Sequence, residues 1–272
     1  MIISVNKLQK AEDRGGWTSS KGNQNKWFDG ENWYKEDGLG YEALSEVLVS
    51  RLLERTTVET FVRYEKVALE KGGFCHSGCC SADFMMPEDE KIISVERLFQ
   101  AYRGESAAKA MLRYTSTQER IQYLVENVED MTGLENFGCY LKKIVTVDTL
   151  FLNEDRHFHN LAVIQRKDGT FRECPVFDNG AALFSDVKGG YPLEMELEAC
   201  YEKIEAKPFS RDFDEQLDAC EILFGGFSFQ AFFTMKDVET VLKEFQDIYE
   251  ERILNRVYDA MCRQMRKYSY LF

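Results

Sequence analysis

Hydrophobic and polar positions follow different periods in the two parts of the chain. Residues 25–36 carry two aromatic-rich arms on either side of Asp29-Gly30, a pair typical of tight β-hairpin turns. Residues 40–56 repeat apolar positions with helical spacing and predict a helix of about four turns. A further β segment is expected from residue 61 to residue 84, broken at Lys71-Gly72-Gly73. The first third therefore predicts hairpins around a single helix.

Helical periodicity dominates from about Glu88 onward. Helices are expected near residues 94–103, 116–131, 133–150, 211–224, 236–248 and 250–267. One hairpin interrupts them, with its turn at Asp168-Gly169. This order predicts an α+β fold of two lobes, with a β-rich N-terminal lobe over residues 1–84 and a helical C-terminal lobe over residues 85–272. Clefts between lobes commonly bind ligands.

Composition limits the class of protein and its partners. The chain has 272 residues, of which 44% are hydrophobic, enough for each of two lobes to bury a core. No stretch approaches the roughly 18 uncharged apolar residues of a membrane span, and the N-terminus lacks a secretory signal pattern. We therefore expect a cytoplasmic protein that does not enter membranes. The formal net charge of −13 repels phosphate backbones, so nucleic acid is not an expected partner.

The eight cysteines are scattered and mostly lie in apolar segments, which is typical of reduced core residues. One cluster, Cys75, His76, Cys79 and Cys80, has the composition of half a metal site. No second ligand pair follows at suitable spacing, so a cysteine-rich strand is the preferred interpretation.

Asp155, Asn160 and Asp178 are the first candidates for a catalytic site. If Asp168 and Gly169 are the two turn residues of the hairpin, residues whose numbers add to 337 pair. Asn160 then lies opposite Phe177 and beside Asp178, and a bulge at Pro175 would shift this register by only one residue. Asp155 precedes Asn160 by five residues, in the turn after a predicted helix. Three oxygen donors are therefore expected close together.

Carboxylate and amide oxygens suit Mg²⁺, whose coordination is typically completed by substrate phosphates. A phosphoryl-transfer site also needs a base or positioning group at the acceptor hydroxyl. Asp155 fits that role, with Asn160 and Asp178 as metal ligands. Each residue alone is better explained by structure, with Asp155 capping a helix, Asn160 filling a turn and Asp178 starting a loop. Only the combination favours function. Zinc on Asp155, His157 and His159 is a weaker alternative, because magnesium also explains Asn160 and Asp178.

These residues also carry a family resemblance. The segment "DRHFHN", residues 155–160, resembles the Asp-Arg-His-x-x-Asn catalytic loop of the phosphatidylinositol 3- and 4-kinase-like kinases, and "VFDNG", residues 176–180, resembles their Asp-Phe-Gly-type metal motif. The spacing of Asp155, Asn160 and Asp178 is similar to that in bacterial HipA-like serine/threonine kinases. The resemblance implies a bilobal protein-kinase-like fold, Asp155 as catalytic aspartate, His157 beside the transferring phosphate, and magnesium on Asn160 and Asp178. Arg156 fits either a salt bridge that holds the loop or a catalytic part, and His159 has no assigned role.

A kinase of this type needs phosphate-binding backbone near its N-terminus. Residues 14–27 form a glycine- and serine-rich stretch, and its nucleotide-binding candidates are Gly15, Gly16, Thr18, Ser19 and Ser20. The stretch matches neither the Gly-x-Gly-x-x-Gly nor the Walker pattern, so an ordinary flexible loop is the alternative. The three hydroxyl residues are also a candidate site of inhibitory autophosphorylation.

Lys35, in the second arm of the first hairpin, resembles the strand lysine that contacts nucleotide phosphates, with Lys26 as its rival. Glu46 in the following helix is the expected ion-pair partner of Lys35, and Glu42, one turn earlier, is the alternative. Residues 80–84 are expected to carry the adenine through backbone groups.

We therefore expect an ATP- and Mg²⁺-dependent kinase that phosphorylates serine or threonine of a protein, with itself as one candidate substrate. A lipid or small-molecule kinase is the second hypothesis, and a nucleotide-binding pseudokinase or interaction module is the third. The net charge of −13 argues against docking on anionic membranes. The resemblance to HipA-like proteins also implies an antitoxin or another regulatory partner.

Overall fold

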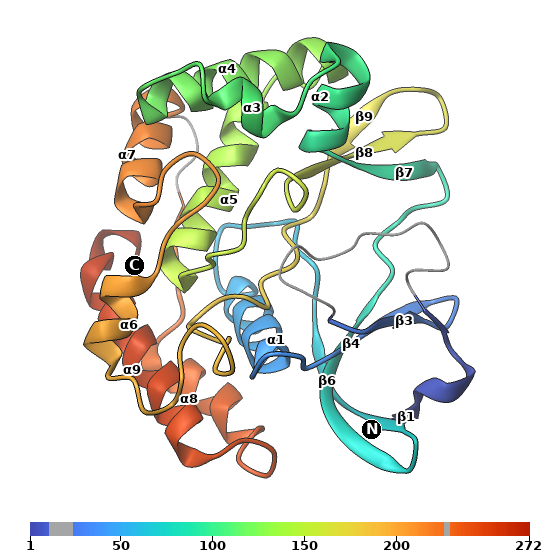
Figure 1. Ribbon diagram of the computed structural model, residues 1–272, viewed down its shortest axis with the longest axis vertical. Coiled ribbons are helices and arrows are strands. Elements are labelled where there is room, and N and C mark those ends of the chain that lie inside the picture. Colours follow the sequence, from blue (N-terminus) through green and yellow to red (C-terminus); the bar gives the residue numbers. More distant parts are fainter. Residues whose placement is uncertain (11–23, 226–228) are drawn as a thin grey trace. The chain divides into compact units, whose positions relative to one another are not determined.

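The computed structural model describes residues 1–10, 24–225 and 229–272 and divides the chain into two compact units (Figure 1). Unit 1 comprises Met1–Asp83, Phe177–Ile204 and Gln230–Phe272, and unit 2 comprises Phe84–Val176 and Glu205–Phe229. The chain therefore leaves unit 1 after Asp83 and returns to it twice. The expected lobe boundary at residue 84 stays a prediction.

Unit 1 is built on a six-stranded sheet in the order β1-β5-β6-β4-β3-β2. Its strands are β1 (Ile2–Ser4), β2 (Gln9–Lys10), β3 (Lys26–Phe28), β4 (Asn32–Glu36), β5 (Glu65–Lys71) and β6 (Phe74–Ala82). Strand β1 runs parallel to β5, and the other neighbours are antiparallel. A short 3-10 turn, η1 (Val5–Lys7), connects β1 and β2.

Both hairpins expected in this region are present. Strands β3 and β4 pair Trp27 with Tyr34, and Gly30 turns the chain between them with a φ of 112°. Strands β5 and β6 are joined at Gly72 and Gly73, whose φ angles of 60° and 84° lie in the left-handed region that glycine adopts without strain. The aromatic arms and the two glycine turns therefore did predict the central part of the sheet.

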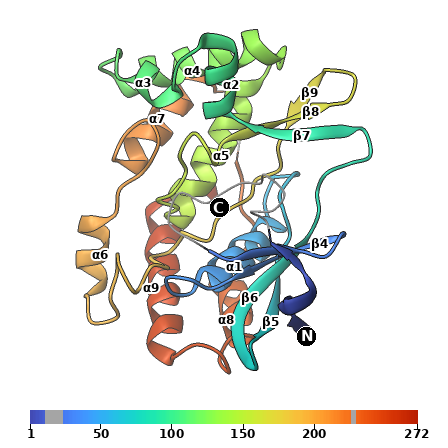
Figure 2. The ribbon, with the colours of Figure 1, turned by 45° about the vertical axis from the view of Figure 1, so that its right-hand side comes forward.

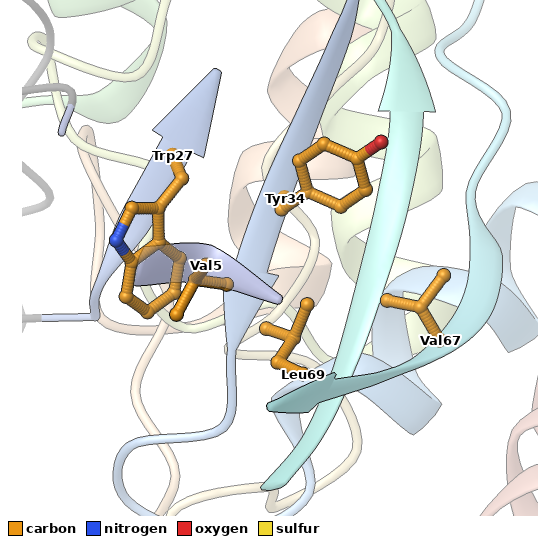
Figure 3. Packing of buried hydrophobic residues seen from close by; sticks show 5 residues of the cluster. All are labelled: Val5, Trp27, Tyr34, Val67 and Leu69. Carbon is orange, nitrogen blue, oxygen red and sulfur yellow. The ribbon is translucent and has the colours of Figure 1, made fainter. Parts of the chain in front are cut away.

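The period of two along each strand gives the sheet two different faces. On one face Val5, Trp27, Tyr34, Val67 and Leu69 form a buried apolar cluster, with residues contributed by four segments (Figure 3). The adjacent positions Lys26, Lys35 and Cys79 alternate to the other face. The apolar cluster stabilises the strands that hold these two lysines.

Four helices lie in the described part of unit 1: α1 (Glu42–Leu53), α6 (Leu197–Lys203), α8 (Met235–Lys243) and α9 (Glu251–Lys267), with a final 3-10 turn η3 (Ser269–Leu271). Helix α1 packs on β5, β6 and α8, and α8 packs on α9 (Figure 2). Almost all of α1 is buried, which explains why its apolar residues surround the helix instead of forming a single stripe. Helix α6 was not expected from the sequence.

Among its described residues, unit 2 contains a three-stranded sheet, β7-β8-β9, and five helices. Its elements are β7 (Asp89–Ser94), α2 (Val95–Arg103), α3 (Ala107–Met111), α4 (Thr117–Thr132), α5 (Phe137–Phe151), β8 (Ala162–Arg166), β9 (Phe171–Glu173) and α7 (Phe213–Leu223). Helix α7 packs on both α4 and α5. Strand β7 lies in the part of the chain where helices were expected, and its pairing with β8 was not predicted.

The register of the β8–β9 hairpin differs from the expected one by one residue. Val163 pairs with Glu173 and Gln165 with Phe171, so paired residue numbers add to 336 and not to 337. The N–H of Arg166 donates to Thr170 O, which leaves a loop of Lys167, Asp168 and Gly169 with Gly169 at a φ of 88°. A left-handed third loop residue is typical of three-residue hairpins. The prediction of a two-residue turn was therefore wrong.

Candidate functional site

In unit 1, Lys35 lies at the centre of a buried cluster of charged side chains. Its Nζ is 2.5 Å from Glu46 Oε1 on α1 and 2.8 Å from Asp178 Oδ1. The hydroxyl of Tyr64 lies 3.2 Å from the same nitrogen. Lys26, which pairs with Lys35 across the hairpin, places its Nζ 3.7 Å from Asp178 Oδ1. Two strand lysines therefore face one aspartate.

The charges of this cluster decide the protonation of Lys35. Burial acts to lower the pKa of Lys35, but the carboxylates of Asp178 and Glu46 outweigh it and hold that pKa well above its usual value. Lys26 shows the opposite balance, because burial lowers its pKa more than Asp178 raises it. Lys35 therefore keeps its proton as an ammonium group, whereas Lys26 loses its proton more easily than an ordinary lysine.

Two glutamates of α1 have different partners. Glu46 accepts from Lys35 through Oε1 and from the Asn179 N–H through Oε2, at 2.5 and 2.9 Å. Glu42 instead folds back to accept from the N–H groups of residues 38–40 before the helix. These N–H groups belong to the loop before the helix, and the first-turn N–H of Ala43 donates instead to Asp37 Oδ1 at 2.7 Å. The structure therefore pairs Lys35 with Glu46, whereas Glu42 holds the loop that leads into α1.

Asp178 reaches this cluster because the segment after it is fastened to α1. The hydroxyls of Tyr41 and Ser45 donate to the carbonyl oxygens of Leu183 and Ala182, at 2.6 and 3.0 Å. Asp178 itself has a φ of 60°, a left-handed conformation that aspartate tolerates better than most residues. This turn directs the carboxylate to Lys35 and the following N–H to Glu46.

In unit 2, the loop that contains Asp155 begins where α5 ends in a left-handed residue. Leu152 has a φ of 54°, and the N–H of Asn153 returns to Asp148 O at 2.8 Å. A bulky residue in this conformation is held by its surroundings, and such residues concentrate at functional sites. Asp148 was missed in the sequence, although a carboxylate within the apolar run "VTVDTLF" was an available signal.

Arg156 is the structural member of the loop. Its Nε and Nη2 bind both oxygens of Asp148 at 2.9 and 3.0 Å, and its Nη1 donates to Asn160 O at 3.1 Å. Both side chains are buried. Of the two roles left open for Arg156, the salt bridge that holds the loop is the one the geometry shows.

Asp155, His157 and Asn160 occupy successive turns of this loop. The Asn160 amide nitrogen donates to Asp155 O at 3.1 Å, which leaves its amide oxygen as the group that can bind a hard cation. His157 Nε2 lies 3.8 Å from Asp155 Oδ2. The Asn160 side chain is thereby tied to the backbone of Asp155.

Two backbone N–H groups, of His159 and Asn160, approach His157 Nδ1 at 3.2 Å. With Nδ1 as acceptor, the neutral ring carries its proton on Nε2. Burial lowers the pKa of His157 more than the nearby Asp155 raises it, so the ring is neutral near pH 7. Nε2 is buried and makes no hydrogen bond to any described residue. His159 contacts the His157 ring edge at a centroid distance of 5.6 Å and gains no chemical role.

Lys207 is a further residue of this site that the sequence did not single out. Its Nζ lies 3.2 Å from Asp155 Oδ1, and its side chain is 44% exposed. No motif marks it, because it is 52 residues from Asp155 in the sequence.

The structure does not place several of the predicted site residues in either of these two clusters. Gly15, Gly16, Thr18, Ser19 and Ser20 lie outside the described residues. Asn160 and Asp178 belong to different units, so their expected proximity stays a prediction. The cysteine cluster, residues 75–80, lies in strand β6, as the preferred interpretation had it. Within the described ranges, no group of three or more His, Cys, Asp or Glu could hold a metal ion.

Comparison with known proteins identifies the class of fold. No known family model matches the chain, and no curated protein matches its sequence. The chain has a kinase-like fold, with a curled β-sheet in its N-terminal region and a helical C-terminal part, as the sequence predicted. It is similar to the crystal structure of a Helicobacter pylori proinflammatory kinase, CtkA, with a TM-score of 0.66 and 14% sequence identity over 97% of this chain and 95% of that one.

None of the described helices is both long and apolar enough to span a membrane.

Proposed function

We propose that the protein is an ATP- and Mg²⁺-dependent kinase that transfers the γ-phosphate to serine or threonine of a protein. The observation that carries this proposal is the buried ion pair of Lys35 with Glu46, with Asp178 on the same ammonium group. Two carboxylates hold this lysine charged, so it is a preformed cation for nucleotide phosphates. The kinase-like fold supports the same conclusion.

The residues present suit magnesium and nucleotide. Asp178 supplies a carboxylate and Asn160 an amide oxygen whose nitrogen is already used, and both are hard oxygen ligands. Magnesium at these residues would neutralise phosphate charge and orient the γ-phosphate. The adenine would lie against the backbone of residues 80–84, and the glycine- and serine-rich stretch from Gly15 to Ser20 would contact the phosphates.

The transfer itself would use the loop of unit 2. Asp155 accepts the proton of the acceptor hydroxyl, and the neutral His157 offers its Nε2–H to the phosphoryl group in transfer. Arg156 holds the loop through Asp148 and takes no part in the reaction. This assignment leaves the catalytic carboxylate and the metal ligand Asn160 fixed relative to each other.

The spacing shared with HipA-like kinases supports a protein acceptor, and it also supports an antitoxin or another regulatory protein as partner. A lipid or small-molecule acceptor is the second candidate. The excess of acidic residues, with a net charge of −13, disfavours an anionic membrane as the place of action.

The test is phosphate transfer from γ-labelled ATP to the protein itself and to dephosphorylated casein, with and without Mg²⁺. We expect Mg²⁺-dependent labelling by the wild type and its loss in Asp155→Ala, while both proteins bind ATP with Mg²⁺. Phosphoamino-acid analysis of the products should give phosphoserine or phosphothreonine. If neither protein transfers phosphate although both bind ATP, the protein is instead a nucleotide-binding pseudokinase.

A further inference from the structure

The contact between Lys207 and Asp155 adds a residue to the site of unit 2. The ammonium group lies 3.2 Å from Asp155 Oδ1, the carboxylate to which the proposed function assigns the acceptor proton. Asp155 is buried, whereas the side chain of Lys207 is 44% exposed and therefore open to a second ligand.

The segment that carries Lys207 is anchored to its own unit two residues further along. The N–H of Phe209 donates to Gln216 Oε1 on α7 at 2.9 Å, and Arg120 on α4 donates to Phe209 O at 2.7 Å. The buried Phe209 ring packs edge-on against Phe158 of the catalytic loop, with centroids 5.7 Å apart. These three anchors hold the backbone beside the loop, so the position of Lys207 is built into the fold.

The loop itself offers little positive charge to a phosphate group. Arg156, adjacent to Asp155 in the sequence, is buried and directs its guanidinium to Asp148 and Asn160 O. His157 is neutral. Phosphoryl transfer concentrates negative charge on the oxygens of the group that moves, and a fixed cation there stabilises the transition state. Lys207 supplies such a cation beside the carboxylate that meets the acceptor.

Resting on the proposed function, we propose that Lys207 is a catalytic residue whose ammonium group binds both Asp155 and the phosphoryl group in transfer. In that step the acceptor oxygen forms a bond to the γ-phosphorus as the bond to the β–γ bridging oxygen breaks. The electron pair of the broken bond stays on ADP, and the hydroxyl proton passes to Asp155. Lys207 keeps its own protons throughout and donates hydrogen bonds to the carboxylate and to a phosphoryl oxygen.

The experiment compares Lys207→Met with Lys207→Arg and with Arg211→Met. Arg211 is the matched control, because it is a cation of the same segment whose side chain is exposed and paired with Glu205. Steady-state rates with casein as acceptor give kcat and both KM values, and thermal melting and ATP titration check folding and binding. We expect Lys207→Met to lower kcat by about 10²–10³-fold with KM for ATP within about threefold. Lys207→Arg should recover part of the rate, and Arg211→Met should match the wild type.

Three other results would contradict the inference. Equal kcat in Lys207→Met and Arg211→Met would show Lys207 to be an ordinary surface cation. A raised KM for casein at unchanged kcat would show that Lys207 binds the acceptor and not the transferring group. If Lys207→Met fails to fold, Lys207→Gln takes its place, and a wild-type kcat in that variant is equally decisive against the role. An inactive wild type would contradict the proposed function, whereas an active wild type with an unimpaired Lys207 variant contradicts this inference alone.

Discussion

The Lys35 cluster of unit 1 and the Asp155 loop of unit 2 hold their charges in opposite ways. In unit 1 the residues proposed to bind the nucleotide are themselves the ion pair, since Lys35 is bound by Glu46 and Asp178. In unit 2 the strong buried pair, Arg156 with Asp148, lies behind the loop. The reactive groups have longer contacts there, 3.2 Å from Asp155 to Lys207 and 3.8 Å to His157.

This difference separates the residues proposed to bind the nucleotide from the residues proposed to react. A cation that must meet several phosphates benefits from being fixed and charged before the ligand arrives. A carboxylate that must accept a proton has to remain accessible to the acceptor, so its support comes from neighbours. Variants of unit 1 should therefore impair ATP binding, and variants of the loop should impair turnover or stability.

The largest effect should separate the two aspartates. We expect Asp155→Asn to lower kcat by about 10²–10⁴-fold at unchanged ATP affinity, because it removes only the proton acceptor. Asp178→Asn should lower kcat by about 10²–10³-fold and also abolish the dependence of ATP affinity on Mg²⁺, since a metal ligand is lost. Calorimetric titration of ATP at several Mg²⁺ concentrations measures the difference. Equal Mg²⁺ dependence in both variants would remove Asp178 from the metal site.

The second-largest effect should come from removing the buried ion pair of Arg156 with Asp148. Asp148→Asn leaves the guanidinium of Arg156 buried without its carboxylate, and we expect a loss of about 3–5 kcal/mol in the free energy of unfolding. Urea denaturation measures this value. The control is Glu105→Gln, which removes the exposed pair with Arg113 and should leave the denaturation midpoint unchanged. A stable Asp148→Asn protein would show that the loop has other, sufficient support.

A smaller effect should distinguish the two strand lysines. Lys35→Met removes the ammonium that binds Glu46 and Asp178, and we expect ATP affinity to fall by about 10–100-fold. Lys26→Met removes the same charge from a residue 3.7 Å from Asp178, and its effect should stay below about tenfold. ATP titration of both variants decides between them. A larger loss in Lys26→Met would make Lys26 the main phosphate-binding lysine.

The smallest expected effect is a pH dependence confined to unit 1. Burial raises the pKa of Asp37 to about 7, against an ordinary value of 3.8, despite hydrogen bonds from the Tyr249 hydroxyl and the Ala43 N–H. Between these values the folded carboxyl keeps a proton that the unfolded chain has lost, so its contribution to stability falls as pH rises from about 4 to about 7.

Asp37→Asn should remove that slope, which for one group is at most about 1.4 kcal/mol per pH unit. Urea denaturation of the variant and the wild type at pH 5, 6 and 7 gives the difference. Asp168 is the control, because hydrogen bonds from Thr170 lower its pKa, so Asp168→Asn should give no slope in this range. A constant difference between Asp37→Asn and wild type across these pH values would show that the buried carboxyl stays ionised.

Local signals in the sequence predicted most elements but not how they pair. The hairpin of β3 and β4, the glycine turn of β5 and β6 and helix α5 all follow from nearby residues. Strand β7 was missed because its pairing with β8 is a long-range contact. The β8–β9 register was wrong by one residue because Asp168-Gly169 fits either of two loop lengths, and only the pairing shows which one forms.

The sequence by itself determined the chemistry of the candidate site: the order and spacing of Asp155, Asn160 and Asp178, and a lysine in a strand before a helix with a glutamate. Residue types, their order and their spacing are properties of the sequence itself, so they can be read before the chain is folded. The sequence also favoured Glu46 over Glu42 as the partner of Lys35, and the structure contains that pair. Only the tertiary structure paired Arg156 with Asp148 and Lys207 with Asp155. These partners are separated by folded segments, so their contacts depend on how helices and strands pack and are not encoded in any local pattern.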